Sequence, residues 1–145
     1  NLGNVMKESA TIALDYVKSK ASKYNIDPKF FESHGIHIHV PEGAVPKDGP
    51  SAGIALTTAV ISCLTNTKVK STVAMTGEVN LRGQALAIGG LKEKSLAALR
   101  SGIKTIVIPR DNQKDISDLP HEVISKLEIV LMDQVDDALE VAFEK

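Results

Sequence analysis

The segment Pro46-Lys47-Asp48-Gly49-Pro50-Ser51-Ala52-Gly53 joins a loop to a helix that the sequence predicts to be buried. The residues before Ser51, from Pro41 to Pro50, include three prolines and two glycines, a composition typical of a loop. The apolar run from Ala52 to Leu64 predicts a helix that is apolar on most sides. A serine at this junction is either a helix N-cap or a nucleophile beside unpaired backbone N–H groups, and the segment alone fits both roles.

Outward from this junction, the sequence alternates between the helical period and the strand period. We expect helices over residues 3–23, 51–65, 91–101 and 135–143, a short helix ending near residue 31, and two short helices within 112–126. We expect strands over 36–40, 72–75, 104–108 and 128–131, and a hairpin over 77–87. This order predicts a single α+β domain, α/β-like in character, with a mixed sheet and helices packed against it.

The composition fits one globular domain covering residues 1–145. A net charge of -1 and an aromatic content of 3% give no indication of a nucleic-acid partner, and no apolar run has the length of a membrane span. The single cysteine, Cys63, excludes an intrachain disulfide, fits a reducing compartment, and is predicted to be buried in its apolar helix. Because the sequence starts at Asn1 almost directly on a helical pattern, we expect a domain excised from a larger protein.

A nucleophilic serine needs a base, and histidine is the usual partner. His37 and His39 lie two residues apart on a predicted strand and therefore share one face. With Glu42 nearby they allow a weak zinc hypothesis, which lacks a third ligand at a characteristic spacing. The polar face of an edge strand is the favoured interpretation of this pair.

A lysine can serve as the base if it is held neutral. Burial and the helix dipole both act to lower the pKa of a lysine. Lys92 and Lys94 both fall in the first turn of the helix that follows Gly89-Gly90, where the dipole is positive. Lys94 shares a helix face with small side chains and is slightly favoured, although a solvated surface lysine explains either residue. Asp48 could orient such a base or cap the helix after it.

Four separated motifs occur in the order seen in the proteolytic domain of Lon, the ATP-dependent serine protease, and the chain resembles its bacterial and mitochondrial subfamily. The motifs are residues 46–53, Ala74-Met75-Thr76-Gly77-Glu78, Leu81-Arg82-Gly83 and Gly89-Gly90-Leu91-Lys92-Glu93-Lys94. The segments 2–10 and 37–44 resemble the same domain, and the resemblance is close to about residue 108 and looser beyond it. One departure is Ala87, where many relatives have proline.

The resemblance implies a role for each candidate residue. Ser51 matches the family's nucleophile, Lys94 matches its general base, and Thr76 matches a threonine that helps to hold the lysine. Asp48 matches a loop aspartate and is a secondary candidate. His37 and His39 match family histidines to which we assign no catalytic step.

The resemblance also implies a serine endopeptidase with a Ser-Lys dyad that hydrolyses unfolded or damaged proteins delivered by an ATPase module. ATP and Mg²⁺ would belong to that module, because this sequence has no Gly-x-x-x-x-Gly-Lys-[Ser/Thr] loop, and the domain itself would need no cofactor or metal. We expect a homo-oligomeric ring, a hexamer in the full-length protein, in the cytoplasm or the mitochondrial matrix. The alternatives are a non-catalytic Lon-like assembly domain of an ATPase and, more weakly, a zinc hydrolase at His37 and His39.

Overall fold

The computed structural model describes residues 3–38 and 51–144. The helices are α1 (Asn4–Ser19), α2 (Phe30–Ser33), α3 (Gly53–Thr65), α4 (Leu91–Arg100), α5 (His121–Lys126) and α6 (Val135–Ala142), with 3₁₀ segments η1 (Ala21–Tyr24) and η2 (Arg110–Asp118). The strands are β1 (Val73–Met75), β2 (Glu78–Val79), β3 (Ala85–Leu86), β4 (Thr105–Pro109) and β5 (Glu128–Met132). These elements form an α+β fold, as the sequence predicts.

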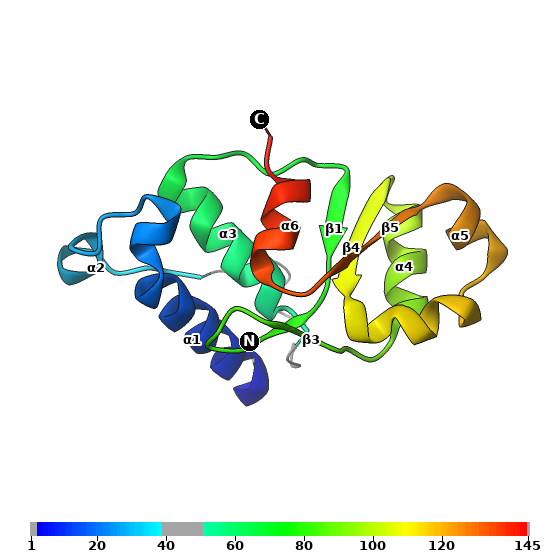
Figure 1. Ribbon diagram of the computed structural model, residues 1–145, viewed down its shortest axis with the longest axis horizontal. Coiled ribbons are helices and arrows are strands. Elements are labelled where there is room, and N and C mark those ends of the chain that lie inside the picture. The colour runs from blue at the N-terminus through cyan, green and yellow to red at the C-terminus, as the bar shows by residue number, and fades with distance from the viewer. Residues whose placement is uncertain (1–2, 39–50, 145) are drawn as a thin grey trace.

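A parallel sheet with the strand order β1-β4-β5 lies at the centre of the domain. Strand β1 reaches β4 through the antiparallel β2–β3 pair and α4, and β4 reaches β5 through η2 and α5. Figure 1 shows α3 and α6 on one side of this sheet and α4 and α5 on the other. A parallel sheet covered on both faces is the arrangement that crossover helices produce.

The two faces of the sheet contribute to two separate hydrophobic cores, because alternate residues of a strand point in opposite directions. One face packs with α1, α3 and α6, and its strand residues are Val73, Met75, Val107, Val130 and Met132. The other face packs with α4 and α5, and its strand residues are Ala74, Ile106, Ile108, Ile129 and Leu131. This division explains why β4 reads as a continuous apolar run in the sequence.

Four sequence expectations need correction. Residues 36–38 lie outside any helix or strand, and the rest of the expected 36–40 strand falls outside the described residues. The helix expected to open at Ser51 begins at Gly53, with Ala52 as its N-cap residue. The first helix ends at Ser19 and continues only as the short 3₁₀ turn η1. Cys63 is exposed, because the helix that carries it buries its opposite side.

Within the part of the chain that the structure describes, no helix is both long enough and apolar enough to cross a membrane.

Candidate active site

The first feature of the site is a reciprocal pair of backbone hydrogen bonds that joins the start of α3 to the residue after Thr76. The Gly77 N–H donates to the Ser51 carbonyl at 3.0 Å, and the Ile54 N–H donates to the Gly77 carbonyl at 3.0 Å. Ser51 lies in the turn that leads into α3. Its main chain is therefore fixed against the segment that continues from the end of β1.

Glycine makes this close approach possible. A Cβ atom on Gly53 would lie 2.8 Å from both the backbone nitrogen and Cγ1 of Val79. A Cβ atom on Gly77 would lie 2.9 Å from side-chain atoms of Ile54 and Met132. Real Cβ atoms essentially never show such distances, so a side chain at either position would force its neighbours to shift, and at Gly53 one of those neighbours is backbone.

Lys94 approaches Ser51 from α4, which lies on the other side of the sheet from α3. It is the fourth residue of α4, where its N–H donates to the Gly90 carbonyl at 3.0 Å. The Lys94 Nζ atom donates a hydrogen bond to Ser51 Oγ at 2.8 Å. Two residues that are far apart in the sequence therefore meet through their functional atoms.

Thr76 completes the group as the residue that follows β1. Thr76 is 6% exposed, and its N–H donates to the Val107 carbonyl at 3.1 Å, which extends the β1–β4 pairing by one residue. The Lys94 Nζ atom also donates to Thr76 Oγ1 at 3.4 Å, a longer and weaker contact than the one to Ser51. Nζ is thus held between two hydroxyl groups.

Burial lowers the pKa of Lys94 from its ordinary value of 10.5. The cause is desolvation, which disfavours the charged ammonium form. The position near the N-terminus of α4 acts in the same direction, because the helix dipole is positive there. A lysine in these surroundings is easier to deprotonate, and its neutral amine can accept a proton from the neighbouring serine hydroxyl.

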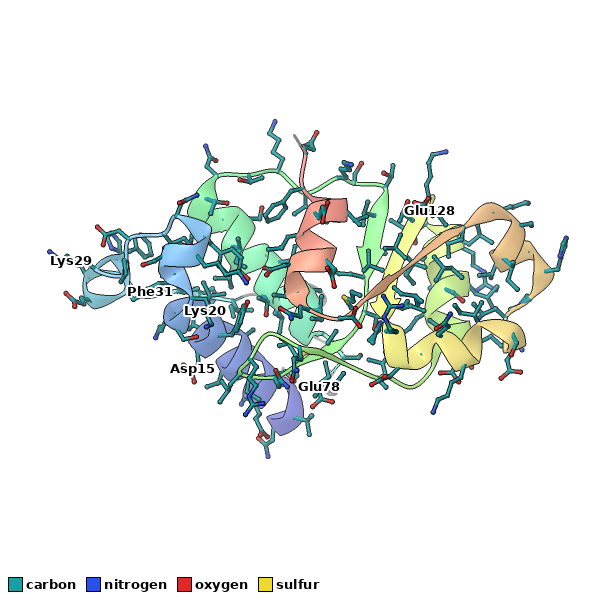
Figure 2. All side chains as sticks on the ribbon, in the orientation of Figure 1. Asp15, Lys20, Lys29, Phe31, Glu78 and Glu128 are labelled. Atoms are coloured by element: carbon teal, nitrogen blue, oxygen red, sulfur yellow. The ribbon has the colours of Figure 1, made fainter. Side chains whose placement is uncertain are left out.

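The site lies at the carboxyl ends of the parallel strands. Figure 2 labels Glu128, the first residue of β5, at the upper end of the sheet, and Glu78, two residues after Thr76, at the lower end. Ser51 is bonded through Gly77 to this lower segment. The carboxyl ends of strands are where ligands bind in open α/β sheets.

Of the remaining candidates, the two that the structure describes, Lys92 and His37, are not brought into this group. Lys92 is exposed, although it shares the first turn of α4 with Lys94. His37 is exposed, and the flanking Ile36 and Ile38 pack against the core. Asp48 and His39 lie outside the described residues, and no cluster of three potential metal ligands occurs among the residues that are described.

The sequence did not predict that the backbone of Gly77 contributes to the site. The sequence indicates Thr76 as a candidate at a strand end where polar site residues gather, but it assigns no role to Gly77. No pattern in the sequence pairs Gly77 with Ser51, because the bond is made by backbone groups of residues far apart in the chain. The glycine itself is the only signal, and glycine is also common in turns.

Comparison with known proteins supplies the family. The family model for the Lon protease (S16) C-terminal proteolytic domain matches residues 1–145. A Lon protease of Chloroflexus aggregans is 58% identical over 144 residues, and one of Vibrio parahaemolyticus is 53% identical over 145 residues. These matches cover 99% and 100% of this chain and 18% of each relative, so the chain spans about a fifth of the length of those proteins. The chain belongs to the family of Lon protease C-terminal proteolytic domains.

Proposed function

We propose that this domain is a serine endopeptidase in which Ser51 is the nucleophile and Lys94 is the general base. The observation that carries the proposal is the 2.8 Å hydrogen bond between Lys94 Nζ and Ser51 Oγ. This distance allows a proton to pass directly between the two atoms. The lowered pKa of Lys94 supports the same role, because only a neutral amine can accept the proton.

The proposed reaction has two halves. Neutral Lys94 takes the proton from Ser51 Oγ while the oxygen attacks the peptide carbonyl carbon, and the resulting ammonium then protonates the leaving amine as the C–N bond breaks. Water attacks the acyl ester and gives a proton to Lys94, which returns it to Ser51 Oγ as the ester bond breaks. Thr76 Oγ1 accepts a hydrogen bond from Nζ and keeps it directed at the serine.

The oxyanion that forms on the substrate requires hydrogen-bond donors close to Ser51. The Ile54 N–H is already committed to the Gly77 carbonyl. The N–H groups of Ala52 and Gly53, earlier in the same turn, are the donors that we assign to the oxyanion. They lie at the positive end of α3, where negative charge is favoured.

The test of this function is covalent labelling. A serine-directed phosphonate or acylating peptide probe is expected to modify Ser51 and to stop peptide cleavage in the same proportion, as measured by mass spectrometry and a fluorogenic peptide assay. Ser51→Ala is expected to remain unlabelled and inactive. A Ser62→Ala variant, on the same helix, serves as the matched control and should keep both properties. A protein that binds its partners but is neither labelled nor active would instead be an assembly domain.

The lowered pKa of Lys94 gives a pH prediction with a definite sign. Lowering the pKa increases the neutral fraction at any given pH, so kcat/KM, which reports the pKa of the free enzyme, should rise with pH and reach half its plateau below pH 10.5. Because the unfolded chain holds this proton more tightly, the free energy of unfolding should also rise between the lowered pKa and 10.5. Stopped assays of kcat/KM against pH measure the first effect. Exposed Lys92 gives the control, since Lys92→Met should leave the profile unchanged.

We also propose the partners that the family implies. The substrates are unfolded or damaged polypeptides, delivered by an ATPase module that uses ATP and Mg²⁺ in the full-length protein. The relatives named above are longer than this chain, which covers 18% of their length, so they have room for such a module. We propose a homo-oligomeric ring, a hexamer in the full-length protein, located in the cytoplasm. The mitochondrial matrix is the alternative location.

A further inference from the structure

A buried asparagine lies next to the segment that carries Lys94 into the site. Asn112, in η2, is 1% exposed. Its Oδ1 atom accepts a hydrogen bond from the Ile88 N–H at 2.9 Å, and its Nδ2 atom donates to the Ile88 carbonyl at 2.8 Å. The amide side chain therefore binds both polar groups of one backbone residue, as a neighbouring strand would do.

A third contact fixes the orientation of this amide. The Nδ2 atom also donates to Asp115 Oδ2 at 2.9 Å. Exchanging the oxygen and nitrogen of the amide would turn Oδ1 toward two acceptors, the Ile88 carbonyl and the Asp115 carboxylate. Both Nδ2 hydrogens are therefore used, and Ile88 is held at a defined position.

The two residues after Ile88 are not held by packing. Gly89 and Gly90 are both exposed, and a Cβ atom on Gly89 would meet nothing within 4 Å. Both glycines line an open hollow of about 290 Å³. Gly90 has a φ of 73°, a conformation that glycine adopts without strain. Such a turn has high conformational freedom, so the position of α4 depends on what holds the chain on each side of it.

Leu91 holds the chain on the far side, since it is 5% exposed and packs in the core beneath α4. Asn112 holds it on the near side through Ile88. We infer that Asn112 is a positioning residue for the proposed reaction: it fixes the entry of α4 so that the Lys94 amine meets the Ser51 hydroxyl. This inference rests on the proposed function of Lys94 as the general base.

Asn112→Ala tests the inference in the full-length protein. It removes both bonds to Ile88, and misplacing a reacting group by about 1 Å costs on the order of 10²-fold in rate. We therefore expect kcat to fall by about that factor with little change in KM. The ascending limb of the kcat/KM–pH profile should also move toward pH 10.5, because a displaced Lys94 regains water.

Two further variants separate positioning from general stability. Val123→Ala weakens the same core, since Val123 is 0% exposed and belongs to the cluster that contains Leu91. It should lower the unfolding temperature and leave kcat and the pH profile unchanged in the folded protein. Asn112→Asp keeps the shape and the bond from the Ile88 N–H, but when ionised it cannot donate to the Ile88 carbonyl. Asn112→Asp should show the same loss of kcat, and it is the variant to be measured if Asn112→Ala does not fold.

The outcomes distinguish this inference from the proposed function. If Lys94→Arg and Ser51→Ala are inactive while Asn112→Ala and Asn112→Asp keep wild-type kcat and pH profile, Asn112 has no positioning role and the dyad stands. If Lys94→Arg remains active, the dyad itself is wrong and the inference falls with it. A loss of kcat in the Asn112 variants, together with an alkaline shift of the pH profile that Val123→Ala does not show, supports both the Ser51–Lys94 dyad and the positioning role of Asn112.

Discussion

Replacing Lys94 with arginine is expected to abolish peptide cleavage while the domain stays folded. Arginine has a somewhat longer side chain and carries a positive charge, but its guanidinium does not give up a proton at accessible pH. It can therefore still donate to Ser51 Oγ, yet it cannot accept the serine proton. Loss of a general base lowers kcat by on the order of 10²–10⁴-fold, and a base that acts as a unit with its nucleophile lies at the upper end of that range.

The measurement is cleavage of a fluorogenic peptide, with thermal unfolding followed by circular dichroism as the test of folding. Lys92→Arg is the matched control, because Lys92 lies in the same turn of α4 but is exposed. We expect it to retain wild-type kcat. Substantial activity in Lys94→Arg would show that another group accepts the serine proton, and the proposed mechanism would then be wrong.

The layout of the fold was largely predictable because strand and helix periods are local properties of the sequence. The strands β4 and β5 and the helices α3, α4 and α6 occur close to where apolar periodicity predicts them. The strand expected over residues 36–40 shows the limit of this reasoning. Ile36 and Ile38 do alternate with exposed His37 and pack against the core, but no ladder of backbone hydrogen bonds forms along 36–38. Alternation predicts burial, whereas strand pairing depends on a neighbour elsewhere in the chain.

The sequence singles out three residues that the structure brings together, Ser51, Lys94 and Thr76, but it does not specify their geometry. A serine before an apolar helix and a lysine after two glycines are visible in the sequence, and the family resemblance singles out Ser51, Lys94 and Thr76 among similar residues. The distance between Ser51 and Lys94 depends on how α3 and α4 pack on opposite faces of the sheet, which no local sequence pattern specifies. The contact of Asn112 with Ile88 could not be predicted for a similar reason, because Asn112 lies in a polar segment and its partner is a backbone group 24 residues away.

Cys63 illustrates a different error. The helix α3 is apolar on most sides, so Cys63, which lies well inside it, was expected to be buried. In the structure only part of its circumference faces α1, α6 and the sheet, and Cys63 lies on the remaining side. An apolar helix therefore predicts a buried element, but it does not specify which of its side chains contacts the core.

Replacing Gly53 with alanine is expected to reduce both stability and activity, although alanine is the better helix former. The new Cβ atom would lie 2.8 Å from the Val79 backbone nitrogen, which cannot move aside as a flexible side chain could. Relief requires α3 and β2 to separate, at a cost of about 1–3 kcal/mol in the free energy of unfolding. Urea titration measures this loss.

Activity should fall further than stability alone explains, because the same displacement acts on the bonds that fix Ser51. Gly53 lies between Ser51 and Ile54, whose backbone groups form the reciprocal pair with Gly77. Moving α3 away from β2 shifts Ser51 Oγ relative to Lys94 Nζ, and a shift near 1 Å lowers kcat by on the order of 10²-fold even in fully folded protein. Gly35→Ala is the matched control, since a Cβ atom there meets nothing within 4 Å, and it should change neither quantity appreciably. If Gly53→Ala and Gly35→Ala have the same kcat and the same free energy of unfolding, close packing of α3 on β2 does not position the nucleophile.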